Sequence, residues 1–218
     1  MRSRTFDRVA VAGLAAVALL TSAMAVRAQD EAGPPEGWEI RTDRGQPAEE
    51  ISFREMTPGF HVTTGPAAIF FNPANAAEGE FRVESEVFLF DPGGRNEAFG
   101  LFIGGSDLAG AGQAYTYFLI RQNGGTLVKR RDGDGTTVIR DWTPHDAVVT
   151  WAEKEEGEST VLNTLAVEAG AEELVFFVNG TEVARVPRAD QLVDGVAGLR
   201  INHGLNLHVG SFEVTPGG

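Results

Sequence analysis

The chain has 218 residues, 42% of them hydrophobic, which is enough to bury a sizeable core in one domain or two small ones. It contains no cysteine, which excludes disulfides, thiolate nucleophiles and cysteine-based metal sites. The formal charge is −13, and because the first 28 residues carry four arginines against one aspartate, the remainder carries −16. Such an acidic chain repels phosphate backbones and anionic headgroups, which argues against nucleic acid and acidic membranes as partners.

The N-terminus has the three parts of a secretory signal peptide. Residues 1–8 are basic overall, residues 9–20 form an apolar run, and residues 23–28 place small side chains where a signal peptidase cleaves. The apolar run is too short to cross about 30 Å of hydrocarbon comfortably, although an uncleaved anchor is the alternative. We therefore predict a signal peptide over residues 1–28, a secreted or periplasmic protein, and no stable membrane span after cleavage.

The rest of the chain has the sequence pattern of a β-protein. Residues 29–37 are polar and contain two adjacent prolines, which is typical of a disordered leader. From residue 38 onward, short apolar runs recur, each closed by Gly, Pro, Asn or Asp, and no helical period lasts three turns. No linker interrupts this pattern, so we predict a single β-sandwich domain over residues 38–218 with about a dozen strands, one of them over residues 147–151.

Two turn sequences predict hairpins. Asn123-Gly124-Gly125 separates the apolar runs 115–121 and 126–131, and Asn179-Gly180 separates 174–178 from 181–186. Asn-Gly pairs adopt the left-handed backbone conformations that tight hairpin turns need.

Two predicted strands each have a face that combines aromatic and charged side chains. In residues 81–90 one face carries Phe81, Val83, Ser85, Val87 and Leu89, and the other carries Arg82, Glu84, Glu86, Phe88 and Phe90. In residues 115–121 one face carries Tyr115, Tyr117, Leu119 and Arg121. Aromatic rings stack on apolar sugar faces and charged groups bridge hydroxyls, so such faces suit carbohydrate binding. The alternative is a face that is merely wet or covered by loops.

Several segments resemble the concanavalin A-like lectin and glucanase sandwiches. They are residues 99–105 and 115–121, and the C-terminal patterns NxLxV from Asn163, FxVNGxxV from Phe176 and GxxGL from Gly195. Among these proteins the chain is most similar to laminin G-like modules and bacterial 3-keto-disaccharide hydrolase-type domains. The resemblance implies an all-β jelly-roll sandwich of two antiparallel sheets. That superfamily includes lectins, glycosidases, carbohydrate-binding modules and protein-binding modules, so the fold does not decide the function.

Two carboxylate pairs are candidates for chemistry. Glu84 and Glu86 share a strand face at a separation of ~6.6–7 Å, which suits a glycosidase pair. The laminarinase-type glucanases that the chain resembles carry a third acidic residue on the same face, where this sequence has Phe88. Asp132 and Asp134 are the candidates for a calcium site, but the terminal glutamate of a calcium loop is missing and a hairpin turn is the alternative.

The leading hypothesis is a non-catalytic exported module that binds carbohydrate. The residues expected to contact the ligand are Glu84, Glu86, Tyr115, Tyr117, Arg121 and Trp142, the last on a loop. One alternative is a glycan-cleaving hydrolase that uses Glu84 and Glu86. Another is a laminin G-like module that binds an extracytoplasmic protein. No cofactor is expected, with calcium left open.

Overall fold

The computed structural model describes residues 33–45 and 47–217. The predicted signal peptide and residues 29–32 of the predicted leader lie outside these residues. No helix in the described part of the chain is long and apolar enough to cross a membrane. The two helices found there, η1 (Ala48–Glu50) and η2 (Trp151–Glu153), are single 3-10 turns.

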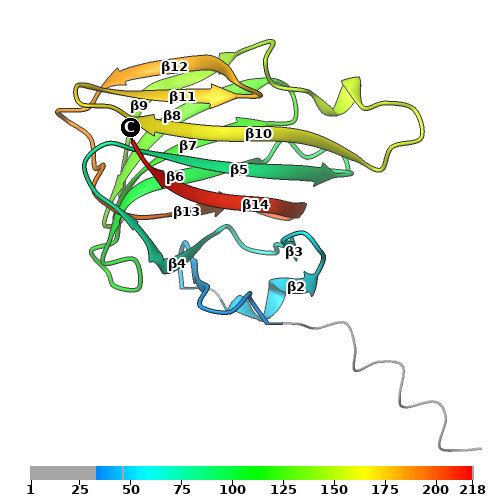
Figure 1. Ribbon diagram of the computed structural model, residues 1–218. Helices are drawn as coiled ribbons and strands as arrows, with labels where there is room; N and C mark the ends of the chain where they lie inside the picture. Colours follow the sequence, from blue (N-terminus) through cyan, green and yellow to red (C-terminus); the bar gives the residue numbers. More distant parts are fainter. Residues whose placement is uncertain (1–32, 46, 218) are drawn as a thin grey trace, which may run out of the picture. The chain divides into compact units, whose positions relative to one another are not determined.

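The described strands form two seven-stranded sheets packed face to face (Figure 1). We name them sheet A, in the order β12-β11-β10-β5-β14-β3-β2, and sheet B, in the order β1-β4-β13-β6-β7-β8-β9. Sheet A contains β2 (Ser52–Glu55), β3 (Phe60–Thr63), β5 (Phe81–Phe90), β10 (Thr160–Ala169), β11 (Glu173–Val178), β12 (Thr181–Pro187) and β14 (Asn206–Pro216). Sheet B contains β1 (Glu39–Thr42), β4 (Ala68–Ala77), β6 (Ala98–Ser106), β7 (Ala114–Arg121), β8 (Gly125–Asp132), β9 (Gly135–Pro144) and β13 (Gly195–Ile201).

All neighbouring strands pair antiparallel, so the predicted jelly-roll sandwich of two antiparallel sheets is confirmed. Strand β5 shows most clearly how the sequence pattern places a strand in such a sandwich. Its side chains alternate between buried and half-buried along its whole length. Its apolar face packs into the core between the sheets, and its mixed face lies on the side of sheet A that points away from sheet B.

Strand β7 differs from this pattern. Phe118 and Ile120 enter the core between the sheets. Tyr115, Tyr117 and Leu119 are buried as well, in a second cluster that contains residues of sheet B and of the loop after β6 but none of sheet A. That cluster therefore lies on the outer side of sheet B. The outward face of β7 is covered, which was part of the alternative to a carbohydrate-binding face.

Both predicted hairpins form. Strand β7 turns into β8 through Asn123-Gly124, and β11 turns into β12 through Asn179-Gly180. Asn179 and Gly180 have φ values of 51° and 76°, as the left-handed turn requires. The turn at Asp132 to Gly135 joins β8 to β9.

Two asparagines explain the C-terminal sequence pattern. The Asn163 side chain accepts from the Val149 N–H and donates to the Val149 carbonyl, both at 2.9 Å. The Asn179 amide donates to Asn163 Oδ1 at 2.9 Å and to the Ala147 carbonyl at 2.8 Å. These bonds pin residues 147–149 to sheet A. Because side chains satisfy this backbone, it needs no strand partner, and the predicted strand over residues 147–151 is absent.

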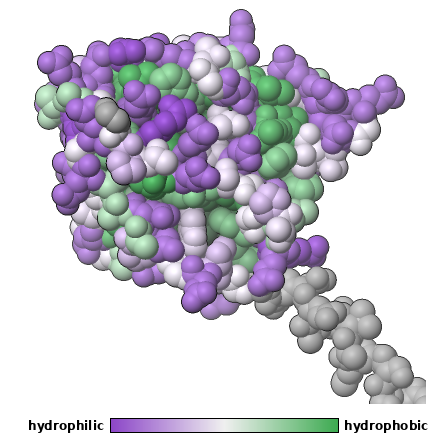
Figure 2. Space-filling model, in the orientation of Figure 1, coloured by the Kyte–Doolittle hydropathy of each residue, from purple (hydrophilic) through white to green (hydrophobic). Residues whose placement is uncertain are grey.

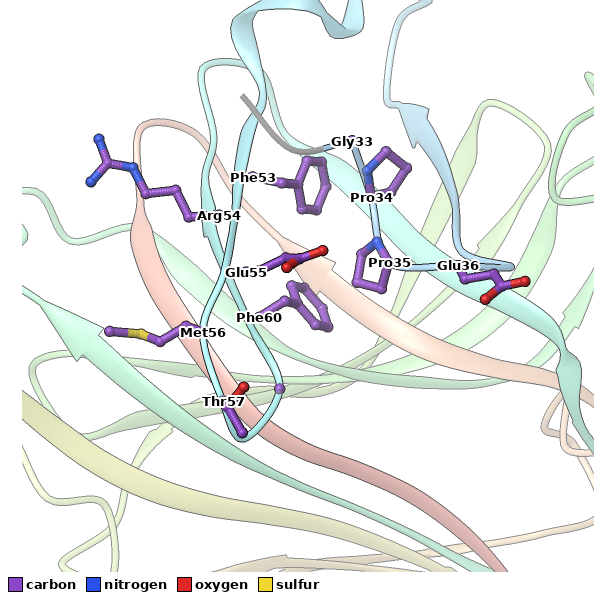
Figure 3. Close-up of a pocket in the computed structure, with 11 residues that line it drawn as sticks. Gly33, Pro34, Pro35, Glu36, Phe53, Arg54, Glu55, Met56, Thr57 and Phe60 are labelled. Carbon is purple, nitrogen blue, oxygen red and sulfur yellow. The ribbon is translucent and has the colours of Figure 1, made fainter. Parts of the chain in front are cut away.

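The start of the domain lies against strands β2 and β3. Pro34 and Pro35 face the rings of Phe53 and Phe60 across a groove of about 480 Å³ (Figure 3). The Trp38 N–H donates to the Pro35 carbonyl at 2.9 Å, so this part of the predicted leader makes a hydrogen-bonded turn.

Candidate functional site

The predicted ligand-binding residues fall into two groups. Glu84 and Glu86 lie on β5, on the outer side of sheet A. Tyr115, Tyr117 and Arg121 lie on β7, in sheet B. Trp142 lies in strand β9, not on a loop as predicted, and packs against the second cluster on the outer side of sheet B. Since the sandwich core separates the two outer sides, the residues do not form one shared face.

Two tyrosines form the floor of the outer side of sheet B. Tyr115 is 0% exposed and Tyr117 is 5% exposed, and their rings lie 5.5 Å apart between centroids. Burial raises the pKa of both phenols, that of Tyr117 to about 12. In this structure the two rings support the side chains above them and are not open for a sugar to stack on.

A glycine-rich loop after β6 covers part of this floor. Leu108 in that loop is buried in the second cluster. The Asp107 carboxylate accepts from the Gly112 N–H and the Asp107 carbonyl from the Gly110 N–H, both at 2.8 Å. A Cβ atom at Gly110 would lie 1.9 Å from the Asp107 carboxylate, so the loop can wrap around that side chain only because position 110 is glycine.

Arg200 and Asp43 form an ion pair above the tyrosines. Arg200 Nη1 and Nη2 donate to the two Asp43 carboxylate oxygens at 2.6 and 2.5 Å, and Nη1 lies 3.3 Å from the Tyr115 hydroxyl. The guanidinium carbon lies 5.5 Å from the centre of the Tyr117 ring. This bidentate geometry holds the arginine in one orientation.

The charges of this pair are strongly coupled. Burial alone would raise the pKa of Asp43, but the hydrogen bonds and charge of Arg200, together with the charge of Arg131, outweigh it and hold the pKa below its usual value. Burial lowers the pKa of Arg200, but its bonds to Asp43 raise it overall. Both groups are therefore charged at neutral pH.

Two further arginines extend the cluster. Arg131 Nη1 lies 3.9 Å from Asp43, and Arg131 Nε donates to the Gly133 carbonyl at 3.0 Å. The Gln113 side-chain oxygen, with the amide turned to suit its neighbours, accepts from Nε of Arg131 at 3.2 Å and of Arg41 at 3.1 Å. We name Arg41, Asp43, Gln113, Arg131 and Arg200, with the two tyrosines, the arginine–tyrosine cluster.

The accessible border of this face carries an aromatic and a cation. The Arg121 guanidinium stacks on Trp142 at 3.6 Å from the ring centre, and both side chains are half-buried. Lys129 is paired with Tyr117 across β7 and β8, so it points to the same side. No hydrogen bond or ion pair joins the Lys129 side chain to another residue of the described ranges.

The outer side of sheet A has a different character. Glu84 is held by Arg82, whose Nη2 donates to it at 2.6 Å, and Glu86 lies opposite Thr164 and Ser211. Figure 2 shows hydrophobic side chains among hydrophilic ones on this face. Phe88, Val149 and Leu162 line a groove of about 300 Å³ there, and Val149 and Leu162 are 38% and 40% exposed.

The calcium candidates lie on the turn between β8 and β9. Asp132 ends β8 and Asp134 follows Gly133 in the turn itself. Among residues 33–45 and 47–217, no group of three or more His, Asp or Glu side chains is arranged to hold a metal ion.

Four residues of this cluster were not predicted from the sequence as site residues: Asp43, Gln113, Arg131 and Arg200. One signal was available for Arg200, because it stands in an otherwise apolar strand, and a charged side chain is rarely buried unless it is paired. Its partner could not be found in the same way, because Asp43 lies 157 residues away in the chain.

Known structures share this fold at low sequence identity. No family model and no curated protein matches the chain. A carbohydrate-binding module, CBM66 from Bacillus subtilis, is similar with a TM-score of 0.58 and 14% identity over 82% of this chain and 95% of that one. A Bacteroides ovatus mixed-linkage glucan GH16 protein gives 0.57 and 7% over 85% and 98%. A Bacillus subtilis protein of unknown function with a galectin-like fold gives 0.54 and 8% over 82% and 89%. The chain thus has a concanavalin A-like jelly-roll fold.

Proposed function

We propose that this protein is an exported, non-catalytic module that binds carbohydrate on the outer side of sheet B. The observation that carries the proposal is the Arg200–Asp43 pair, fixed by two hydrogen bonds above two buried tyrosines. Rigid donors on a supported floor are what a sugar-binding site requires, because little entropy is lost when the ligand arrives. Sandwiches of this fold include a carbohydrate-binding module, which supports the proposal without establishing it.

Trp142 and Arg121 provide the proposed contact surface. Trp142 is half-buried and lies at the border of this face, beside the arginine that stacks on its ring. An aromatic ring beside fixed polar groups suits a sugar, which has apolar C–H faces and hydroxyl edges. Tyr115 and Tyr117 act beneath the ligand as support.

The proposal assigns no catalytic step to Glu84 and Glu86. Glu84 is engaged by Arg82 at 2.6 Å, and the next residue on the same face is Phe88. A second candidate function, that of a protein-interaction module, concerns the outer side of sheet A. The groove lined there by Phe88, Val149 and Leu162 suits an apolar protein segment.

A glycan panel measured by calorimetry tests the proposal. We expect at least one soluble glycan to bind, and Trp142→Ala to weaken that binding by about tenfold, the equivalent of ~1.4 kcal/mol. Phe88→Ala is the matched control, since it removes a half-buried aromatic from the opposite sheet.

Retained affinity in Trp142→Ala together with lost affinity in Phe88→Ala would move the site to sheet A. An absence of binding across the panel would overturn the carbohydrate proposal and favour the protein-interaction module.

A further inference from the structure

We infer that the ligand of this face is an acidic glycan, recognised through the carboxylate of a uronic-acid-type sugar. The inference rests on the proposed function, because it names the class of sugar for the same site. It comes from the distribution of charge between the two sheets, which the net charge of the chain conceals.

The two sheets have opposite charges. The seven strands of sheet B contain seven Lys and Arg residues and three Asp and Glu residues, a net of +4. The seven strands of sheet A contain three basic and seven acidic residues, a net of −4. A chain with a formal charge of −13 therefore has one cationic sheet.

The cations of sheet B gather on its outer side. Arg41, Arg121, Lys129, Arg131 and Arg200 share that side, as the strand registers and the contacts of the arginine–tyrosine cluster show. Glu39 and Asp43 oppose them from β1 and the turn that follows it, and Asp107 opposes them from the loop that covers this side. Five cations against these three carboxylates leave an excess of positive charge on this side.

Some of the donors have no partner within the described residues. Lys129 makes no ion pair there, and Arg200 Nε is buried without a hydrogen bond. Arg200 is only 7% exposed, so an unmatched donor on it is costly to leave unsatisfied. An acceptor bound at this face would satisfy the free charge of Lys129 and lie within the field of the buried arginines.

A carboxylate on a sugar fits these groups better than a nucleic acid does. A single carboxylate per sugar can pair with Lys129, which is a point charge beside the half-buried Trp142 and Arg121. The strongly acidic remainder of the molecule repels long polyanions at a distance, whereas a short glycan with one charge per sugar can reach the face.

Calorimetry with matched sugars tests the inference. The probes are tetrasaccharides of galacturonate, glucuronate and mannuronate, each beside its carboxyl-reduced neutral counterpart, at ~20 and ~300 mM NaCl. We expect at least one acidic sugar to bind about tenfold more tightly than its neutral form at low salt, with a smaller difference at high salt, where the charges are screened.

Two variants locate the effect. Lys129→Ala and Arg41→Ala should each lower the affinity for the acidic sugar about threefold to tenfold more than they lower the affinity for its neutral counterpart. Arg185→Ala in β12 of sheet A removes the same charge from the opposite sheet and should change neither.

Equal binding of acidic and neutral forms, or binding of neutral sugars alone, would overturn this inference and leave the carbohydrate proposal standing. If acidic sugars bind but Arg185→Ala weakens them as much as Lys129→Ala does, net charge rather than this face is responsible, and the inference also fails. No binding of any sugar in the wider panel would overturn the proposed function itself.

Discussion

At the scale of single residues, the account depends on Arg200 and its neighbours. Its side chain is almost fully buried, and a buried charge is tolerated when a partner and hydrogen bonds replace its water. Asp43 supplies the charge, and the Tyr115 hydroxyl lies within hydrogen-bond distance of the same guanidinium. Substituting or titrating these groups should therefore change the free energy of unfolding or the absorbance of the protein.

Asp43→Asn should destabilise the folded protein. The substitution leaves the Arg200 charge buried without a counter-charge, and we expect the free energy of unfolding to fall by about 3 kcal/mol. Chemical denaturation of the wild-type protein and the variant measures this difference. Glu84→Gln, which breaks the Arg82 ion pair on the surface of sheet A, is the control and should cost below ~1 kcal/mol. Equal effects of the two substitutions would contradict the buried-pair description.

The same pair predicts that the free energy of unfolding falls at acid pH. The pKa of Asp43 is lowered by folding, so its contribution to the free energy of unfolding is present above its unfolded pKa of about 4 and is lost as the pH falls through the folded value. Asp43→Asn removes the titrating group. The stability of that variant should fall less steeply than that of the wild type below about pH 4.

The two tyrosines predict an alkaline titration that is easy to observe. The chain contains no tyrosines other than Tyr115 and Tyr117, and burial raises the pKa of both. In the folded protein, tyrosinate absorbance should therefore stay low at about pH 10, where the unfolded chain is half-titrated. Because the folded pKa is raised, the stability that Tyr117 contributes is complete below about pH 10 and is lost between about pH 10 and 12. Half-titration of the native protein near pH 10 would show that the phenols are open to solvent.

At the scale of elements, alternation identified the core side of a strand best where the other face is wet. The alternation in β5 identified its core side because each successive side chain changes face. The alternation in β7 was also present, but its polar–aromatic face is covered by the loop after β6 and by the residues after β1. Periodicity reports which side chains share a face. It does not report what covers that face, nor to which sheet a strand belongs.

The asparagines of the C-terminal sequence patterns connect a strand to a neighbouring segment. Asn163 is 2% exposed and connects β10 to residues 147–149 through its whole amide group. We expect Asn163→Ala to lower the free energy of unfolding by about 3 kcal/mol, since it leaves buried backbone groups without partners. Asn123→Ala, at an exposed turn where the side chain makes one 3.4 Å contact, is the matched control and should cost below ~1 kcal/mol. Similar losses in both variants would contradict the structural role of the buried amide.

At the scale of the whole molecule, charge is segregated between the sheets. The net charge of −13 argued against nucleic acid and acidic membranes as partners, but a sum over the chain does not say where the charges lie. Once the strands are assigned to sheets, the positive side chains lie on one face. The fold class and the hairpins could be predicted from local patterns. The arginine–tyrosine cluster could not, because it joins residues from both ends of the domain, as Asp43 and Arg200 show.

The three tryptophans allow the central claim to be tested in one experiment. Trp38 packs against Phe60 and Phe212, Trp151 lies in η2, and only Trp142 lies on the outer side of sheet B. Their indole N–H signals in a nitrogen–proton correlation spectrum can be followed while a bound glycan is added. The account predicts that the Trp142 signal moves with the ligand concentration while those of Trp38 and Trp151 stay in place. A shift of Trp151 with an unchanged Trp142 would contradict it and place the ligand elsewhere on the sandwich.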